Sequence, residues 1–193
     1  MDSQPLWSAV AGDEPTGTRW RAESSRLAYS AGRYRPFAET IEEAAQLAGV
    51  PPTRAADLLR GMGERLRPWR EAPEVLGRLG EHVRIGVVTN CSEELGQRAA
   101  GRVGIEFDTV VTAETAGAYK PQPEPYRLAL ERLSVQSSRA LFVAGSPPDI
   151  AGARRAGMDV CWHNRRRLPL GDREPPLAEV ESLEPLLAIA ASG

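Results

Sequence analysis

Apolar positions in the first 74 residues recur at three- and four-residue intervals, which is the spacing of amphipathic helices. The pattern predicts helices over 20–30, 36–48 and 52–66. Prolines separate these segments and continue beyond the last one: Pro36, Pro51, Pro52, Pro68 and Pro73. No strand pattern occurs in this region, so residues 1–74 are expected to form a small helical bundle.

After Pro73 the pattern changes to short apolar runs that alternate with amphipathic segments. We predict strands over 83–88, 107–112, 140–144 and 158–162. The predicted helices are 74–79, a segment opening at Ser92, 123–133, 147–156 and 183–190. This alternation is typical of a parallel sheet covered on both faces. The expected fold is therefore α/β, with a Rossmann-like core over 75–193 and a separate helical unit over 1–74.

Composition narrows the class of protein. With 41% hydrophobic residues, 26% charged residues and a net charge of −2, the chain can bury a core but lacks the basic surface of a nucleic-acid-binding protein. The run Arg165 to Arg167 is expected to be a solvated loop. No apolar run approaches the roughly 18 residues of a membrane span, and no leader pattern opens the chain, so we expect a cytoplasmic protein without a membrane partner. The two cysteines lie far apart and suggest neither a disulfide framework nor a zinc site.

Lys120 is the only lysine among the 24 basic residues of the chain. All the others are arginine, whose planar guanidinium cannot replace a compact ammonium where space is tight. The alternative is chance, since a single lysine must fall somewhere. We interpret Lys120 as a functional residue.

Polar side chains follow three of the predicted strands. Thr89 and Asn90 end the first, Lys120 lies in the loop after the second, and Ser146 and Asp149 follow the third. In parallel α/β sheets the working site lies at the carboxyl ends of the strands. A hydroxyl, an amide, an ammonium and a carboxylate would meet there, a combination suited to a small anionic substrate.

Each of these residues also has a purely structural interpretation. Ser146 followed by Pro147 and Asp149 is a good helix start, in which Asp149 only caps backbone N–H groups. Thr89 and Asn90 could be turn residues. Cys91 at a helix start could carry an activated thiolate, but without a histidine nearby in sequence we favour a small buried residue. We interpret the histidines and tryptophans as structural or surface residues: His82, His163, Trp7, Trp20, Trp69 and Trp162.

Several stretches carry a family resemblance. They are Val-Val-Thr-Asn-Cys-Ser (87–92), Tyr-Lys-Pro-Gln-Pro-Glu-Pro-Tyr (119–126), Phe-Val-Ala-Gly-Ser-Pro-Pro-Asp (142–149), Cys-Trp-His-Asn-Arg (161–165), Trp20-Arg21 and Gly-Arg-Tyr-Arg-Pro-Phe (32–37). In order and spacing the chain resembles the haloacid dehalogenase (HAD) superfamily of hydrolases. It resembles most its 2-haloacid dehalogenase branch, in which a helical cap covers a Rossmann-like core. The resemblance spans nearly the whole chain.

The resemblance implies a role for each matching residue. Thr89 and Asn90 would hold the substrate carboxylate or a developing negative charge, and Lys120 would neutralise the nucleophile and the substrate. Asp149 would support Lys120 or the hydrolytic water. Two further residues would bind substrate, with Tyr126 lining the pocket and Arg21 of the cap receiving the leaving halide. The implied reaction is attack by an aspartate on the halogen-bearing carbon, followed by hydrolysis of the ester.

Two departures lie in the stretch that resembles the fourth motif. Ser146 stands where the phosphatase branch has an aspartate that helps to hold Mg²⁺. Only Asp149 is then left in this stretch to bind a cation, which is too few oxygen ligands for Mg²⁺. We therefore expect no metal and no cofactor, with Mg²⁺ reserved for a phosphatase-like alternative. The dehalogenase pattern has Ser-Ser-Asn where this chain has Ala144, Gly145 and Ser146.

The family's first motif, Asp-x-x-Gly-Thr at the end of the central strand, is not in the sequence. Without that strand, two half-sheets would face each other across unpaired backbone groups, each costing roughly 1–3 kcal/mol when buried. Our hypothesis is that the natural chain begins upstream of Met1 and that the N-terminus is truncated. The alternatives are a catalytically silent binding protein and a Mg²⁺-dependent small-molecule phosphatase. An exposed cap or sheet edge would favour a homodimer.

Overall fold

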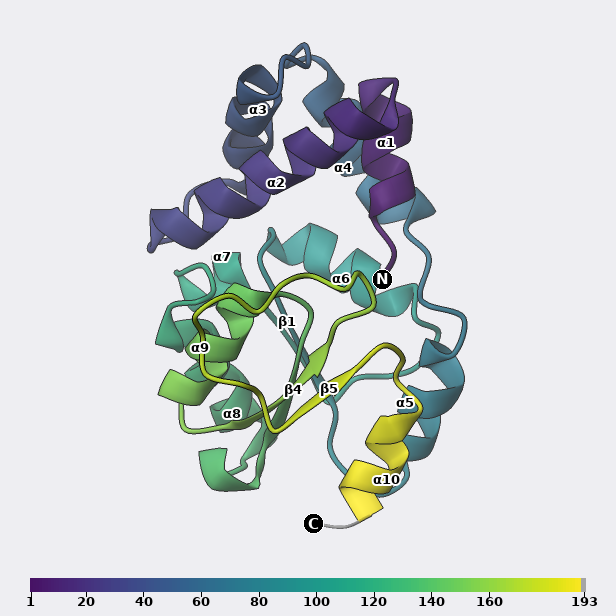
Figure 1. The fold of residues 1–193 in the computed structure, drawn as a ribbon, viewed down its shortest axis with the longest axis vertical. Helices are drawn as coiled ribbons and strands as arrows, with labels where there is room; N and C mark the ends of the chain where they lie inside the picture. The colour runs from purple at the N-terminus through teal and green to yellow at the C-terminus, as the bar shows by residue number, and fades with distance from the viewer. Residues whose placement is uncertain (192–193) are drawn as a thin grey trace.

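The computed structural model describes residues 1–191 and consists of a helical part above an α/β part (Figure 1). Four helices make the upper part, which we call the helical lobe (residues 4–65): α1 (Gln4–Ala11), α2 (Glu14–Ala31), α3 (Phe37–Leu47) and α4 (Arg54–Arg65). The remaining elements, from α5 onward, form the α/β body (residues 72–191). The chain passes between the two parts near Asp2, whose N–H donates to the carbonyl of Arg67 at 3.0 Å.

The apolar core of the helical lobe continues into the α/β body, where Cys91, Ala113 and Tyr119 belong to the same buried cluster. Trp7 of α1 and Trp20 of α2 meet edge to face with ring centroids 5.2 Å apart, and Trp20 donates its Nε1–H to the carbonyl of Ile41 at 3.0 Å. Gly17 lets α1 and α2 approach closely, because a Cβ at this position would lie 2.5 Å from the Cα of Ser8. Asp13 accepts from the N–H of Thr16 and so caps α2.

The α/β body contains two parallel sheets in residues 1–191. One pairs β1 (Gly86–Thr89) with β2 (Thr109–Thr112). The other has the order β3 (Leu141–Ala144), β4 (Asp159–His163) and β5 (Ala178–Val180). The connecting segments are α6 (Glu93–Gly101), α7 (Ala113–Ala116), α8 (Pro123–Leu133), the 3-10 turn Ser137–Arg139 and α9 (Pro147–Arg155), and α10 (Pro185–Ala191) packs on α5 (Ala72–Gly80).

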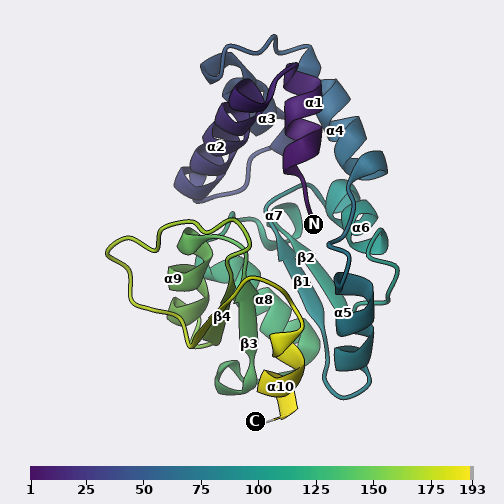
Figure 2. The same cartoon turned by 45° about the vertical axis from the view of Figure 1, so that its right-hand side comes forward.

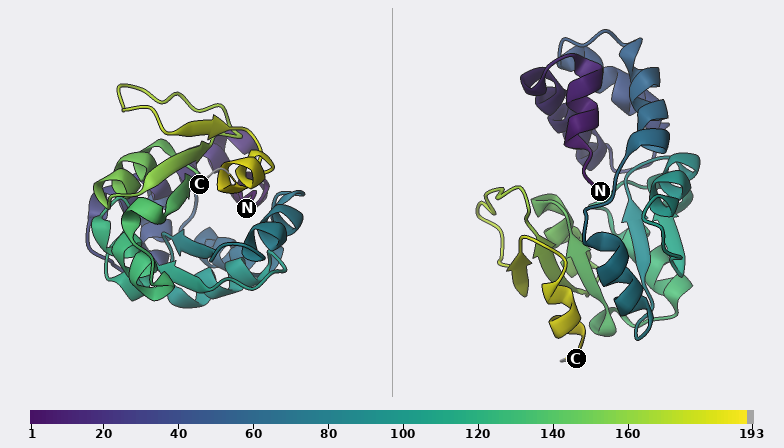
Figure 3. Two further views of the ribbon diagram at one scale, coloured as in Figure 1. Left: turned by 90° about the horizontal axis from the view of Figure 1, so that it is seen from below. Right: turned by 90° about the vertical axis from the view of Figure 1, so that its right-hand side faces the viewer.

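The two sheets lie side by side without a ladder between them. Within the described residues β1 pairs only with β2, and β3 only with β4, so the strand edges on the inner side of each sheet are unpaired. Helix α8 joins the sheets: it packs on β1 and β2, while its Tyr126 ring meets Phe142 of β3 with centroids 5.1 Å apart. Figure 2 shows β1 and β2 on one side of the α/β body and β3 and β4 on the other, and the view from below in Figure 3 shows the elements of this body arranged in a ring.

Sequence patterns located most elements of the fold. The predicted α/β class is confirmed, and helix 123–133 has the predicted bounds. Four elements were not predicted: α1, α7, the 3-10 turn and β5. The predicted solvated loop at Arg165 to Arg167 was wrong for its first residue. Arg165 is half-buried, pairs with Glu71 and lies over the Trp69 ring at 4.4 Å.

A second contact between the two parts lies far from the Asp2 crossing. There Tyr34 donates its N–H to Gly117 and Tyr119 donates its N–H to Gly32, both at 2.9 Å. The buried Tyr119 hydroxyl also donates to the carbonyl of Arg35 at 2.8 Å. We call this the loop contact; it holds the segment that leads directly into Lys120.

Candidate active site

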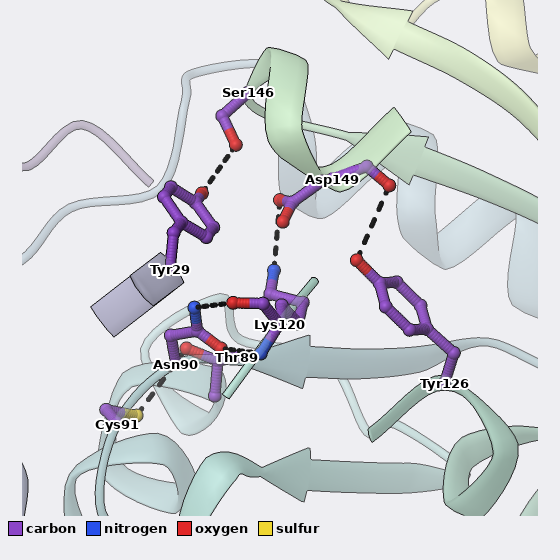
Figure 4. A network of polar contacts seen from close by, with 8 residues as sticks. All are labelled: Tyr29, Thr89, Asn90, Cys91, Lys120, Tyr126, Ser146 and Asp149. Carbon is purple, nitrogen blue, oxygen red and sulfur yellow. Dashed lines mark hydrogen bonds and ion pairs between the residues drawn. The ribbon is translucent and has the colours of Figure 1, made fainter. Parts of the chain in front are cut away.

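Lys120 and Asp149 form a buried ion pair at the carboxyl ends of the strands (Figure 4). Lys120 Nζ lies 3.1 Å from Asp149 Oδ2, and the two residues are only 8% and 4% exposed. The lysine comes from the loop after β2 and α7, whereas the aspartate lies in the first turn of α9, after β3. The pair therefore bridges the two sheets. A buried charge is tolerated when a partner compensates it, and here each residue provides that partner.

Asn90 holds the loop that carries Lys120. Its Oδ1 accepts from the Lys120 backbone N–H at 2.8 Å, and its Nδ2 donates to the Lys120 carbonyl at 3.2 Å. The side chain thus satisfies both backbone groups of one residue, and Asn90 is more than a turn residue. One N–H of the amide remains, and Asn90 also lines the cavity described below.

Asp149 does not cap its own helix. Its Oδ2 binds Lys120, and its buried Oδ1 has no hydrogen-bond partner within residues 1–191. Ser146 stands at the N-cap position but makes no side-chain cap bond. The helix start is as the structural interpretation predicts, with Ser146 at the N-cap and Pro147 directly after it, but the predicted capping by Asp149 is wrong. Both side chains point away from the helix start and into the site (Figure 4).

Tyr126 supports the aspartate from behind. Its hydroxyl donates to the Asp149 carbonyl at 3.4 Å, and its ring is fully buried against Phe142 and Gly152. Burial raises the pKa of Tyr126, and the nearby Asp149 carboxylate raises it further. Tyr126 is thus a neutral donor that fixes the first turn of α9. The predicted contact of Tyr126 with substrate stays a prediction.

Sequence reasoning missed Tyr29, which reaches the site from α2 of the helical lobe. Its Oη lies 2.6 Å from Ser146 Oγ, although the two residues are 117 positions apart. Burial raises the pKa of Tyr29, and the Asp149 carboxylate also contributes, so the phenol stays protonated. No sequence pattern marks this residue, because helical periodicity alone does not show which side chain will contact another part of the fold.

Arg21, another residue of α2, lines a cavity between the helical lobe and the α/β body. The cavity has a volume of about 160 Å³. Polar residues and apolar residues share its wall: Ser3, Arg21, Ser24, Ser25, Tyr29 and Asn90 with Trp7, Ala28, Phe37 and Met62. A cation and an amide beside an apolar surface suit a short organic anion.

Thr89 and Cys91 lie next to Asn90. Thr89 Oγ1 is 3.5 Å from Cys91 Sγ, and its predicted contact with substrate stays a prediction. Burial raises the pKa of the Cys91 thiol to about 11, so the cysteine is a neutral buried residue at ordinary pH. An activated thiolate at this position is therefore not supported.

Taken together, the site presents a fixed ammonium, an amide and hydroxyl donors. In residues 1–191, no group of three or more His, Cys, Asp or Glu side chains is placed to hold a metal ion. None of the described helices has the length and apolar character that crossing a membrane requires. Within these residues the arrangement can bind an anion and stabilise negative charge as it develops.

Comparison with known families gives a match over most of the chain. A family described as "Haloacid dehalogenase-like hydrolase" matches residues 33–163. These residues include Asn90, Lys120 and Asp149, the core of the site.

Among individual relatives, the (S)-2-haloacid dehalogenase 2 of Pseudomonas sp. (strain CBS-3) is 34% identical over 134 residues, which is 66% of this chain and 58% of that protein. The phosphoserine phosphatase of Thermus thermophilus is 30% identical over 190 residues, 92% of this chain and 75% of that protein. The chain spans about half the length of several curated relatives that it matches.

The fold agrees with a solved structure. The L-2-haloacid dehalogenase from Xanthobacter autotrophicus superposes with a TM-score of 0.83 at 20% identity, over 98% of this chain and 93% of that one.

Proposed function

The chain belongs to the haloacid dehalogenase-like hydrolase family, and from that premise we propose that its site performs dehalogenase-like hydrolysis of a small 2-substituted carboxylic acid. The buried Lys120–Asp149 pair is the observation that carries the proposal. It places one compact cation at the carboxyl ends of both sheets, where an anionic nucleophile and an anionic substrate both need charge compensation.

The roles that we propose follow from these positions. Lys120 neutralises the attacking carboxylate, while Asn90 fixes the Lys120 backbone and offers its remaining N–H to the substrate. Arg21 lines the cavity from α2 and receives the leaving halide. Thr89 stands at the end of β1 as a further donor to the substrate carboxylate. Tyr126 keeps the Asp149 turn in place from behind.

This chemistry requires a nucleophilic carboxylate that faces Lys120. Asp149 cannot serve, because its charge is already paired with Lys120 in the ground state. The unpaired inner edges of β1 and β3 flank the lysine and leave room in the hydrogen-bonding scheme for one further strand that would carry the carboxylate. We propose that a carboxylate on such a strand is the nucleophile.

The second candidate is phosphate-ester hydrolysis, which the similarity to the Thermus phosphatase favours. Phosphatases of this kind use Mg²⁺ held by several acids. The described residues fit that ion poorly, because Asp149 is the only acid at the site and is bound to Lys120. The third candidate function is that of a catalytically silent protein that binds small anions.

One experiment separates the three. The 193-residue chain, and a chain extended by the codons in frame upstream of Met1, are incubated with 2-chloropropionate or p-nitrophenyl phosphate, with and without Mg²⁺. We expect metal-independent halide release by the extended chain, abolished in Lys120→Met. Metal-dependent phosphate release would support the second function. Inactivity towards both, with 2-chloropropionate still bound, would support the third.

A further inference from the structure

Arg166 differs from its neighbours in the basic run 165–167. Both neighbours form an ion pair with a glutamate, whereas Arg166 forms none with a carboxylate in residues 1–191. Its Nη2 donates instead to Oε1 of Gln4 in α1 at 3.3 Å, across 162 positions of the sequence. The exposed guanidinium group, which belongs to the segment after β4, is thus held against the helical lobe by a neutral acceptor.

The same oxygen of Gln4 also accepts from Arg21, whose Nη1 lies 3.5 Å away. Arg21 likewise forms no ion pair with a carboxylate in the part of the chain that the structure describes. The Gln4 amide nitrogen donates to Ser8 and Thr18, which fixes its oxygen toward the two arginines. Because both arginine nitrogens lie within 3.5 Å of one oxygen, they are at most about 7 Å apart. Like charges at this distance repel, and one neutral oxygen compensates them only in part.

Arg21 brings its charge to the wall of the cavity of about 160 Å³. Ser3, Ser24 and Ser25 line the same cavity, and their hydroxyls make no side-chain hydrogen bond within residues 1–191. Asn90, which holds the lysine loop, is also part of the wall. A short molecule in this cavity can therefore contact the amide of Asn90, the hydroxyls and the guanidinium group of Arg21.

We propose that the substrate is a short dicarboxylate whose second carboxylate binds between the guanidinium groups of Arg21 and Arg166. The inference rests on the proposed dehalogenase-like function, in which the first carboxylate is that of the 2-substituted acid. The forked guanidinium group matches a planar carboxylate and forms charge-assisted hydrogen bonds with it. The bond to Gln4 uses one of the five N–H donors of Arg21, so donors remain for the leaving halide. The small volume of the cavity favours a short acid.

The test compares 2-chlorosuccinate with 2-chloropropionate of the same configuration, because the two acids differ by one carboxylate. Their binding to the 193-residue chain is measured by calorimetry, which needs no turnover. We expect 2-chlorosuccinate to bind about 5- to 10-fold more tightly, a modest factor because Arg166 is exposed. In Arg166→Gln this ratio should fall to about 2 or below. The matched control is Arg167→Gln, an exposed neighbour paired with Glu181, which should keep the wild-type ratio.

A second variant fills the site from within the chain. Gln4→Glu places a carboxylate of the same shape against both guanidinium groups, so the preference for 2-chlorosuccinate should disappear while urea unfolding shows a folded protein. Equal affinities for the two acids in the wild type, or equal ratios in Arg166→Gln and Arg167→Gln, would overturn the inference. If halide is released without a preference for the dicarboxylate, the proposed function stands and the inference fails. If the preference is found but the extended chain releases no halide from either acid, the proposed function fails and the anion site stands.

Discussion

Replacing Lys120 by methionine tests the buried ion pair directly. Methionine keeps most of the side-chain length and removes the charge, which leaves Asp149 buried without a compensating group. The structure makes this costly, because within residues 1–191 Oδ1 has no hydrogen-bond partner and Oδ2 would lose its bond to Lys120. Removing one member of a buried pair destabilises a protein by roughly 3–5 kcal/mol. At about 2–4 °C per kcal/mol for a chain of this size, Tm should fall by roughly 6–20 °C.

The assay is urea unfolding followed by tryptophan fluorescence, since buried tryptophans occur in both parts of the fold. The control is Arg98→Ala, which breaks the exposed 2.8 Å pair with Glu94 and should change stability by about 1 kcal/mol or less. The double variant Lys120→Met with Asp149→Leu should regain most of the loss, because an apolar pair of similar volume often replaces a buried ion pair without penalty. If Lys120→Met unfolds at the same midpoint as the Arg98 control, the pair is not a buried compensated charge, and the reasoning about the site is refuted.

Three further results are expected. Gly17→Ala should destabilise the protein by about 1–3 kcal/mol, because the new Cβ would overlap the α1 backbone. The control Gly77→Ala, in an open part of α5, should be neutral or stabilising by up to about 1 kcal/mol. Equal urea midpoints for the two variants would contradict this expectation. Asn90→Ala should cost about 1–3 kcal/mol for its two hydrogen bonds to Lys120 and should raise hydrogen exchange at the Lys120 amide, so unchanged exchange would show that the amide does not hold this loop. Because burial raises the pKa of the Cys91 thiol, the folded state keeps a proton that the unfolded chain releases at lower pH. The contribution of this thiol to the free energy of unfolding is therefore fully present below the unfolded pKa and is lost as pH rises towards about 11. In urea unfolding at alkaline pH, Cys91→Ala should flatten this decline, and a decline parallel to that of the wild type would refute the assignment.

How far the sequence predicted the molecule depended on whether the information was local. The strand after 83 and the helix 123–133 were visible because apolar periodicity is a property of neighbouring residues. Helix α1 was missed because its eight residues are too short to establish a period. Strand β5 was missed for a similar reason: it has three residues, with Glu179 in the middle, and follows a long segment without regular structure.

The site divides in the same way. Lys120, Asn90, Ser146 and Asp149 could be found because parallel strands bring their carboxyl ends to one edge, a rule that needs only the order of elements. The partners within the site could not be predicted. That Asn90 binds the Lys120 backbone rather than standing free follows from the path of one loop. Tyr29 depends on how the helical lobe is docked, which no local pattern encodes.

The loop contact makes the orientation of the helical lobe and the occupancy of the site parts of one equilibrium. Its hydrogen bonds include those of Tyr119, one residue before Lys120. The hydrogen bond between Asp2 and Arg67 is a separate link between the helical lobe and the α/β body. A ligand that touches both parts must favour the docked arrangement by the same factor by which docking improves its own affinity. Substitutions in the Gly32–Arg35 turn, which touch no ligand, would thus change binding constants by the amount that they change docking.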